Sequence, residues 1–413
     1  MIDESELQHE SALAPAHETA AADDAGWTGA AVVAALLVAV GLFSWQLLLV
    51  ILAILFFIFM HEMGHFATAR WTGMKATEFF IGFGPRIFSF RRGETEFGLK
   101  PILAGAYVRI IGMNNLDHVD PADEARTYRA ATYPRRVLVI TAGSLMHFAM
   151  AIVLFWAYFG FIGPERIVDW DITEPSPDSA AEVAGLLEGD HLVTVDGVAI
   201  ESFTDLSETV VPRAGQDVII EFERDGELLT TSTVIGERTV GGEVQGFLGV
   251  GPTEGFDVVR EDLGAGAAIG RAFTELPTQM WNSLSGLFGF VENIGGYIDN
   301  VLTPPGNQDQ IDLETRPVSV VGVADISSQI GLDAIYFLAL FNVFIGVFNL
   351  LPLLPLDGGH LAVATYERLR SRSGERYSVD VAKLLPVTYA VFAFMVMFGA
   401  GALWLDLANP IEL

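Results

Sequence analysis

The chain has 413 residues and contains no cysteine. Disulfide bonds and thiolate metal sites are therefore excluded. Positive charge is scarce, with 23 Lys and Arg against 52 Asp and Glu, and the formal net charge of −29 argues against nucleic-acid binding. No Lys or Arg precedes Arg70, and residues 28–60 contain no charged side chain. Long uncharged stretches together with 51% hydrophobic residues indicate a membrane protein.

The uncharged stretches predict where the chain crosses the bilayer. At about 1.5 Å per residue, residues 28–60 would exceed one crossing of a hydrocarbon core of roughly 30 Å. We therefore divide them near Ser44 into an extra apolar segment, 28–44, and a first core helix. The four predicted core helices are 46–69, 136–160, 334–351 and 385–405. Residues 1–27, with seven acidic side chains, predict a disordered tail. The tail is cytoplasmic if the extra segment crosses, which we favour, and external if that segment only extends the next helix.

The distribution of charge predicts the orientation in the plasma membrane. Residues 162–332 contain 30 Asp and Glu but only 7 Lys and Arg. Residues 67–136 and 361–385 together contain 16 of the 23 Lys and Arg. Because basic residues gather on the cytoplasmic side of membranes, we expect these two segments in the cytoplasm and 162–332 outside.

The first core helix ends with His-Glu-Met-Gly-His at residues 61–65. Ionisable groups at membrane depth are costly, so a functional role is the default interpretation. On a helix, His61 and His65 lie on one face and can bind one zinc ion, with Glu62 beside them as general base. The alternative is a chance match to a short pattern, which its place after an uncharged run makes less credible.

Asp357 is the candidate third ligand, because it follows a second long uncharged run. A catalytic zinc takes three protein ligands and leaves a fourth position for water. Pro352 and Pro355 are predicted to break the helix, and Gly358 and Gly359 to relax the backbone beside Asp357. Both motifs adjoin basic segments, which predicts a zinc site towards the cytoplasmic side.

These motifs resemble those of the site-2 protease family of intramembrane zinc metalloproteases. The similar stretches are His-Glu-Met-Gly-His at 61–65, Phe-Asn-Leu-Leu-Pro at 348–352, Leu-Asp-Gly-Gly-His at 356–360, and 82–98, which is similar to a membrane-associated β-loop. The resemblance covers about 46–405 and is closest to the PDZ-containing, actinobacterial-like bacterial branch.

The resemblance implies a polytopic α-helical membrane protein with an inserted extracytoplasmic PDZ-like α+β domain and a membrane-associated β-loop. It implies one zinc ion per chain, held by His61, His65 and Asp357. The implied reaction is peptide hydrolysis within or near the span of a single-span substrate. An anti-sigma factor cut by regulated intramembrane proteolysis is one such substrate.

The resemblance also implies residues that touch the substrate. Asn349 is implied to contact the substrate backbone near the zinc, and Asn342 is a weaker case. Either side chain could instead only hold helices together. The family often has Gly-Pro-x-x-Asn where this chain has Gly-Ser-Leu-Met-His at 143–147, so His147 is a candidate in place of the Asn. His360 is expected beside the zinc ligands rather than among them.

Residues 165–255 are predicted to form the inserted domain. Residues 176–200 read as a short helix, a Gly turn, an alternating strand and an Asp-Gly turn, and Ala-Gly-Leu-x-x-Gly-Asp at 184–190 resembles a PDZ signature. Further strands are predicted at 217–223, 227–235 and 246–251, and any groove would be bordered by Gly185, Leu186 and Leu187. The domain either binds peptides at a sheet edge or only blocks access to the helices.

The remaining segments complete the predicted organisation. Residues 46–160 form the first catalytic half and 333–405 the second, with amphipathic helices or loops at the membrane surface in 256–332. Two other functions are possible. A catalytically inactive PDZ-bearing scaffold would have no need of Glu62, and a membrane di-iron oxygenase would need more than the eight scattered His residues.

Overall fold

The computed structural model describes residues 22–113, 118–240, 243–253, 255–307, 310–371 and 377–411. It divides into two compact units, one formed by 1–152 with 276–413 and the other by 153–275. Most of the predicted acidic tail lies outside the described residues. Its last residues, from Ala22, begin helix α2 (Ala22–Phe43).

Among the described residues, four helices are long and apolar enough to cross a membrane. They are α3 (Trp45–Trp71), α4 (Tyr133–Phe161), α10 (Ala334–Asn349) and α12 (Leu385–Ala408), the last two counted with the 3₁₀ turns that lead into them. They correspond to the four predicted core helices. The predicted division near Ser44 is confirmed, because α2 ends at Phe43 and α3 begins at Trp45. The Ser44 hydroxyl accepts a hydrogen bond from the Leu47 N–H at 3.1 Å, which caps the new helix.

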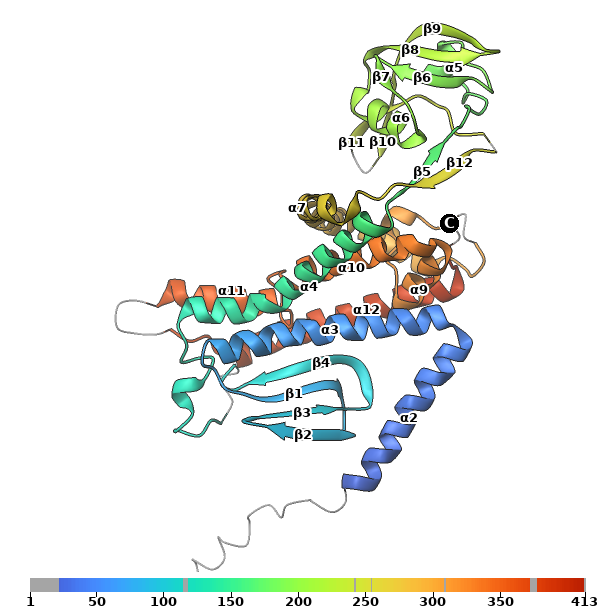
Figure 1. The fold of residues 1–413 in the computed structure, drawn as a ribbon. Coiled ribbons are helices and arrows are strands. Elements are labelled where there is room, and N and C mark those ends of the chain that lie inside the picture. The colour runs from blue at the N-terminus through green and yellow to red at the C-terminus, as the bar shows by residue number, and fades with distance from the viewer. Residues whose placement is uncertain are drawn as a thin grey trace, which may run out of the picture. The chain divides into compact units, whose positions relative to one another are not determined.

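A four-stranded sheet lies in the same unit and is larger than the predicted β-loop. Its strands are β1 (Ala76–Phe83), β2 (Phe88–Arg92), β3 (Thr95–Leu99) and β4 (Ile102–Ile110). The order is β2-β3-β1-β4, with β1 parallel to β3 and antiparallel to β4. Edge strand β4 lies beside α3 (Figure 1).

The two faces of the sheet have different chemistry. On one face, Phe79, Phe97 and Phe90 stack across three strands, with ring centroids 5.7 and 5.5 Å apart, and Phe66 of α3 packs on them. The other face carries Glu78, whose carboxylate accepts hydrogen bonds from Tyr107 Oη at 2.7 Å and Arg109 Nη1 at 3.1 Å. Although partial burial raises the pKa of Glu78, these hydrogen bonds hold it below its usual value. The sheet is thus apolar towards α3 and charged on its opposite side.

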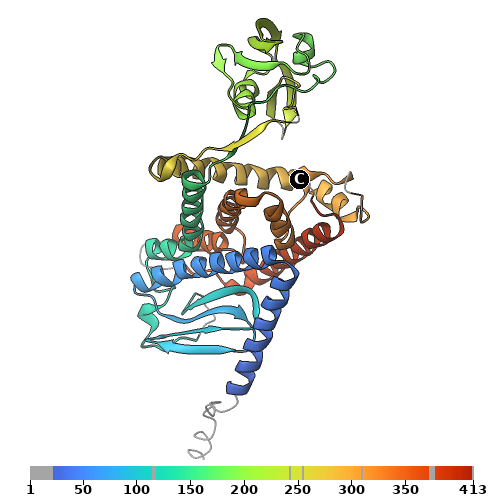
Figure 2. The ribbon, with the colours of Figure 1, turned by 45° about the vertical axis from the view of Figure 1, so that its right-hand side comes forward.

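Helix α2 lies along the end of this sheet (Figures 1 and 2). A Cβ placed on Gly29 would lie only 2.9 Å from Ile87 Cγ1, in the turn before β2. The beginning of α2 is therefore close to the sheet, while its last residue precedes α3. The start of α2 and the sheet that follows α3 are therefore expected on the same side of the membrane.

Helix α11 (Asp357–Arg370) is joined to the start of α4 by polar contacts. Arg136 Nη2 donates to Glu367 Oε2 at 2.7 Å, and both side chains are largely buried. The Val379 N–H donates to the other oxygen of Glu367 at 2.9 Å. Tyr133 and Thr365 join the same two helices through their hydroxyl groups, 3.0 Å apart.

A second buried ion pair anchors the end of α12. Arg316 follows the 3₁₀ helix η4 (Leu313–Thr315), and its Nη2 donates to Asp406 Oδ1 at 3.0 Å and to the Asn409 carbonyl at 2.6 Å. Asp406 Oδ2 accepts from the N–H of Ser319, the N-cap of α9 (Val320–Gln329). Further 3₁₀ turns, η5 (Gly331–Asp333) and η6 (Val381–Leu384), precede α10 and α12. The hydrogen bonds of Arg316 and Asp406 hold the segment that leads into α9 against the last turn of α12.

The second unit contains the inserted domain. Strands β6 (His191–Val195), β7 (Val198–Ala199), β8 (Asp217–Arg224) and β9 (Glu227–Val234) form a sheet of order β7-β6-β8-β9. Helices α5 (Ala180–Val183) and α6 (Phe203–Val210), followed by η2 (Val211–Arg213), pack with it around a common core. The predicted strands at 217–223 and 227–235 are confirmed.

One prediction for this domain is wrong. The strand predicted at 246–251 is replaced by β11 (Glu243–Phe247), which pairs with β10 (Gly236–Val240), because the following backbone bonds to the loop at 173–181 instead. The Leu186 side chain is 2% exposed and belongs to the domain core. Leu187 is 55% exposed, and Gly185 occupies a turn with φ of 74°.

Strands β5 (Glu165–Val168) and β12 (Asp257–Arg260) form an antiparallel pair at the base of the domain. Two helices follow, α7 (Gly264–Glu292) and α8 (Ile294–Leu302), in the region where the sequence predicts amphipathic helices. Helix α7 exposes large apolar side chains, including Phe273 and Trp281, at 59% and 68%. The short 3₁₀ helix η1 (Glu124–Arg126) belongs to the first unit.

The buried pair Arg316–Asp406 leads to the first prediction. Both side chains are 2% exposed, so Asp406→Asn would leave the guanidinium charged without its partner. We expect the free energy of unfolding in detergent to fall by about 3–5 kcal/mol. Thermal unfolding of the purified protein measures this change. The control is Glu124→Gln, which breaks an exposed pair with Arg129 and should leave the midpoint unchanged. Equal shifts in the two variants would contradict the role given to the buried pair.

Candidate metal centre

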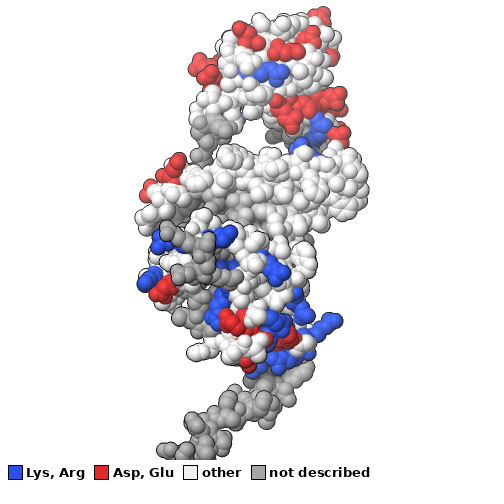
Figure 3. Space-filling view, turned by 90° about the vertical axis from the view of Figure 1, so that its left-hand side faces the viewer, with Lys and Arg blue, Asp and Glu red and all other residues white. Residues whose placement is uncertain are grey.

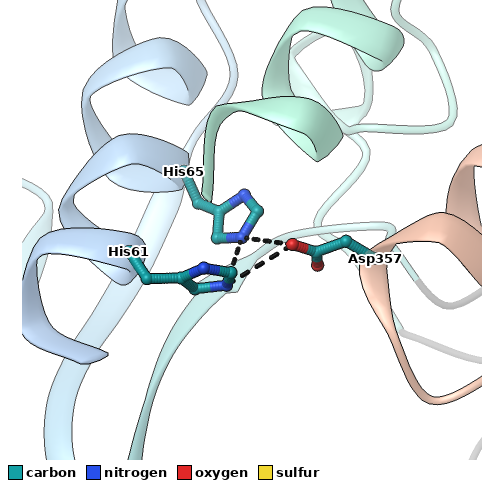
Figure 4. A group of neighbouring side chains, drawn as sticks. All are labelled: His61, His65 and Asp357. Atoms are coloured by element: carbon teal, nitrogen blue, oxygen red, sulfur yellow. Dashed lines mark hydrogen bonds and ion pairs between the residues drawn. The ribbon is translucent and has the colours of Figure 1, made fainter. Parts of the chain in front are cut away.

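Two imidazoles project from one face of α3 (Figure 4). His61 Nε2 and His65 Nε2 are 3.1 Å apart, and the two rings meet edge to face. This arrangement follows from the i, i+4 spacing, which stacks side chains one helical turn apart. The predicted pairing of the two His side chains is therefore present.

Asp357 joins this pair from the first turn of α11 (Figure 4). Its Oδ2 lies 3.4 Å from His61 Nε2 and 3.2 Å from His65 Nε2. In a tetrahedral site with metal–ligand bonds of roughly 2.0–2.2 Å, donor atoms are about 3.3 Å apart. The three atoms have this spacing and can hold one metal ion. Two nitrogen donors and one carboxylate oxygen are a donor set that suits zinc.

His65 is oriented by a contact with α4. Its Nδ1 lies 2.7 Å from the Val139 carbonyl oxygen. A carbonyl oxygen can only accept, so Nδ1 carries the proton and Nε2 presents its lone pair towards Asp357 and His61. The ring is therefore held in the tautomer that a metal ligand requires.

Two glycines allow α3 and α4 to approach each other at this point. A Cβ on Gly143 would lie 2.4 Å from His61 Cε1 and 2.5 Å from His65 Nε2. A Cβ on Gly64 would lie 2.6 Å from the Ala142 carbonyl oxygen. The backbone of α4 thus forms one wall of the group formed by His61, His65 and Asp357. Gly143 opens the motif at 143–147, but its closeness to the imidazoles could not be predicted from the sequence, because it depends on the packing of α4 against α3.

Gly358 and Gly359 serve close packing rather than the predicted backbone relaxation. Both lie in the first turn of α11, and neither has a positive φ. A Cβ on Gly358 would lie 2.2 Å from the carbonyl oxygens of Leu350 and Leu351, and one on Gly359 would lie 2.5 Å from the Leu354 nitrogen. The loop between α10 and α11 is therefore pressed against the turn that carries Asp357.

Glu62 follows His61 on α3 and is partly buried. Its carboxylate lies near the backbone N–H of Val108 on β4. Val108 faces Phe79 of β1 in the sheet register. This contact places the edge of the four-stranded sheet next to the His-Glu-x-x-His motif. The sequence alone did not predict this placement.

His147 and Asn342, two predicted substrate-binding residues, contact each other. His147 Nδ1 lies 2.9 Å from Asn342 Oδ1, and both side chains are buried. The His147 ring centroid is 5.1 Å from that of His61, so the pair is next to the metal-binding group. Asn349 is the last residue of α10 and is half-buried. Gly185, Leu186 and Leu187 lie in the other compact unit.

A cavity of about 900 Å³ adjoins the group. It is lined by β4, by the start of α4 and by α11, and it includes Val108, Leu354 and His360 among its lining residues. Val108 contacts Glu62, and the other two residues flank Asp357 along the chain. The cavity therefore reaches the surroundings of the metal-binding group.

A group able to hold a metal ion, with both of its imidazoles on a helix apolar enough to span a membrane and Glu62 beside them, is the arrangement expected of a membrane metallopeptidase. Residues 49–396 match the profile described as Peptidase family M50, so the chain belongs to that family. The predicted site-2 protease resemblance and the enzyme class, a zinc metalloprotease, are thereby confirmed.

Named relatives are similar over most of their length. The zinc metalloprotease Rip1 of Mycobacterium bovis is 34% identical over 90% of this chain and 99% of its own. Rip1 of Mycolicibacterium smegmatis is 31% identical over the same shares. The putative zinc metalloprotease R01501 of Rhizobium meliloti is 28% identical over 85% of this chain and 93% of its own.

Gly143 supplies a test of the packing around the metal-binding group. In Gly143→Ala the added methyl group would collide with both imidazoles, so zinc affinity should fall by about 10- to 100-fold. Zinc per chain, measured on protein purified in detergent and equilibrated with a zinc buffer, checks this expectation. Gly399→Ala on α12, where a Cβ meets no atom within 4 Å, is the matched control. Unchanged affinity in Gly143→Ala would show that the imidazoles have room to move aside.

Proposed function

We propose that this protein is an intramembrane zinc metalloprotease that cuts a peptide bond within or near the transmembrane segment of a membrane-bound regulator. The observation that carries the proposal is the meeting of His61, His65 and Asp357 at spacings of 3.1–3.4 Å, on helices set among apolar spans. The alternative is a catalytically inactive scaffold. The retained Glu62 beside the metal-binding group favours the protease.

His61, His65 and Asp357 are proposed to hold one zinc ion per chain. When bound, zinc supplies Lewis acidity, which lowers the pKa of a coordinated water towards ~7 and polarises a carbonyl group. Glu62 is proposed as the general base that takes a proton from the attacking water and later delivers it to the leaving amide nitrogen. The backbone N–H of Val108, which lies near this carboxylate, is proposed to orient Glu62 for this exchange.

The substrate is proposed to bind as an extended strand. Peptide bonds in a helix are already hydrogen-bonded, so a transmembrane substrate must unwind before its carbonyl can react. We propose β4 as the strand with which the substrate pairs. This strand pairs with β1 on one side, and on its other side the Val108 N–H points to Glu62. Addition of a strand to such an edge is a common mode of peptide binding.

Polar side chains around the metal-binding group are proposed to contact the substrate. His147 is buried against His61, and Asn342 fixes its orientation from α10. The Asn342 amide nitrogen donates to the Leu338 carbonyl at 3.0 Å, so its oxygen accepts from His147 Nδ1–H. Nε2 of the neutral ring is then an acceptor, which suits a backbone N–H of the substrate. Asn349 is proposed to contact the substrate backbone from the end of α10.

The proposed membrane topology rests on charge and on the contacts of α2. The basic segments 67–136 and 361–385 are placed in the cytoplasm, and the acidic region 162–332 outside. The contact between Gly29 and Ile87 supports a cytoplasmic N-terminus, because it brings the start of α2 to the sheet that follows α3. The two-faced sheet is proposed to lie at the cytoplasmic surface of the plasma membrane, with its apolar face towards lipid.

The domain organisation is proposed as follows. Residues 46–160 and 333–405 are the two catalytic halves, 165–255 is an extracytoplasmic PDZ-like domain, and 256–332 contains surface helices. The combination of α5, α6 and the sheet β7-β6-β8-β9 supports the PDZ-like assignment. The proposed physiological role is regulated intramembrane proteolysis of a single-span regulator such as an anti-sigma factor.

Glu62 and Asp357 should fail differently when they are replaced. Glu62→Gln keeps the side-chain volume and removes the base, so zinc should stay bound while cleavage falls by at least ~100-fold. Asp357→Ala removes one of three ligands, so zinc content and cleavage should fall together. Both variants are purified in detergent, and zinc per chain and cleavage of a single-span substrate are measured.

The two variants separate the protease from its alternatives. Normal cleavage by Glu62→Gln would refute the protease assignment. Full zinc content in Asp357→Ala would mean that the third ligand is another residue, with His147 and His360 the next candidates. Intact zinc binding without cleavage of any span by the unaltered protein would favour the scaffold.

Removal of the PDZ-like domain should change substrate choice but not zinc binding. Val168 and Asp257 face each other in the β5–β12 pair, so residues 169–256 can be replaced by an Asn-Gly turn. None of the proposed zinc ligands lies in the deleted segment, so zinc per chain should stay at the level of the full-length protein. Cleavage of substrates with bulky external domains should rise. Loss of zinc from a folded deletion variant would refute this arrangement.

A further inference from the structure

The cavity beside the metal-binding group has a positively charged lining. Four arginines line it, Arg109, Arg129, Arg136 and Arg368, with Glu367 as the acidic lining residue among the described part of the chain. Its volume of about 900 Å³ is that of a ligand-binding site rather than a packing defect. At its inner end, Val108 contacts Glu62.

The lining charges are only partly compensated within the cavity. Arg136 is paired there with Glu367. Arg109 and Arg129 pair with Glu78 and Glu124, which are not lining residues. Arg368 is exposed on the last turn of α11. Arg109, Arg129 and Arg136 are thus each neutralised by a carboxylate, and the guanidinium group of Arg368 leaves the lining with a net positive charge.

The sequence segments that contain most of the cavity lining residues also carry a net positive charge. Segments 67–136 and 361–385 contain 16 Lys and Arg and 10 Asp and Glu, an excess of six positive charges in a chain whose net charge is −29. Figure 3 shows blue side chains gathered around the ends of the sheet and of α11, and many red side chains on the inserted domain. The cavity therefore lies in the positively charged part of a strongly acidic protein.

We propose that this cavity receives the cytoplasmic flank of the substrate and selects flanks that are acidic. The inference rests on the proposed protease function and adds the class of substrate to it. A chain that leaves the reaction centre along β4 passes directly into the cavity, because Val108 belongs to both. Acidic side chains there would face Arg368.

The selectivity would be against ordinary membrane proteins. Most single-span proteins carry Lys and Arg beside the cytoplasmic end of their span. Such a flank would meet like charges at the mouth of this cavity, whereas an acidic flank would be attracted. The charge of the cavity would thus reject the bulk of membrane proteins before their spans reach the metal centre, and admit an uncommon class.

The test uses the full-length protein in dodecyl maltoside and three single-span substrates. They differ only in the four residues after the cytoplasmic end of the span, which are Asp-Glu-Asp-Glu, Ser-Gly-Ser-Gly or Lys-Arg-Lys-Arg. We expect kcat/KM to fall in that order, by about tenfold between the first and the last, a scale set by a few exposed ion pairs. The difference in kcat/KM between the acidic and basic substrates should shrink in 0.5 M salt, because the screening length of charge interactions is then only roughly 4 Å.

Two variants locate the effect. Arg368→Glu reverses a charge in the lining and should reduce the acidic-over-basic preference by about threefold to fivefold. Arg135→Glu makes the same change at an exposed position next to the cavity that is not part of its lining, and should leave the preference as it is. Arg135→Glu should also leave cleavage of the neutral substrate unaffected.

The outcomes distinguish this inference from the proposed function. Equal cleavage of the three substrates would overturn the inference and leave the protease intact. Failure to cleave any of them would overturn the protease itself, and the inference with it. Equal loss of preference in Arg368→Glu and Arg135→Glu would overturn the cavity as the cause. If flank charge had no effect but Arg368→Glu released bound phosphatidylglycerol, the cavity would be a lipid headgroup site, and the inference would also be overturned.

Discussion

The structure depends on how closely two apolar helices, α3 and α4, and the more polar α11 can approach around a polar group. His61 and His65 are on α3, Asp357 is on α11, and the backbone of α4 lies against the two imidazoles. Donor atoms must come within about 3.3 Å of one another to share a metal ion, and helix axes are normally 8–10 Å apart. Glycine removes the side chains that would keep the backbones apart. Gly143 does so against the imidazoles, and Gly358 does so against the loop that precedes α11.

The same constraint explains how charge is handled in the helical unit. Ion pairs in the interior are few among the described residues, and each joins elements distant in sequence. Arg136–Glu367 joins α4 to the helix that carries Asp357, and Arg316–Asp406 joins the segment before α9 to the end of α12. A buried pair adds little net stability but costs much when one partner is lost, so it defines one arrangement over others. The paired side chains of Arg136 and Glu367 thus hold α4 and α11 together, and these two helices surround the metal-binding group.

The four-stranded sheet connects the metal centre to what lies beyond the helices. Its apolar face continues the surface of α3 through stacked Phe side chains, and its edge strand reaches Glu62 through Val108. The cavity with the basic lining begins at that same edge. One element therefore borders the reacting group, the proposed path of the substrate and the charged surface that would meet its flank. This concentration of roles explains why the protein has a sheet at this position rather than a short loop.

Much of this protein was determined by local sequence. Uncharged runs set the four apolar helices, Ser44 set the division between α2 and α3, and the i, i+4 spacing set the pairing of His61 with His65. These features depend on hydrophobicity and on helical periodicity, which a single segment carries by itself. Asp357 was found because its motif also stands at the end of an uncharged run.

The tertiary structure decided what depends on contacts between distant segments. The closeness of Gly143 to the imidazoles, the bond between His147 and Asn342 and the approach of β4 to Glu62 join positions from 46 to 195 residues apart. The burial of Leu186 likewise depends on the core of its domain. No local pattern distinguishes such residues, because a glycine or an asparagine reads the same whether it faces lipid or a neighbouring helix. The sequence determined which groups are present and on which elements. Packing determined which of them meet, because only the folded chain brings separate backbones within reach of one metal ion.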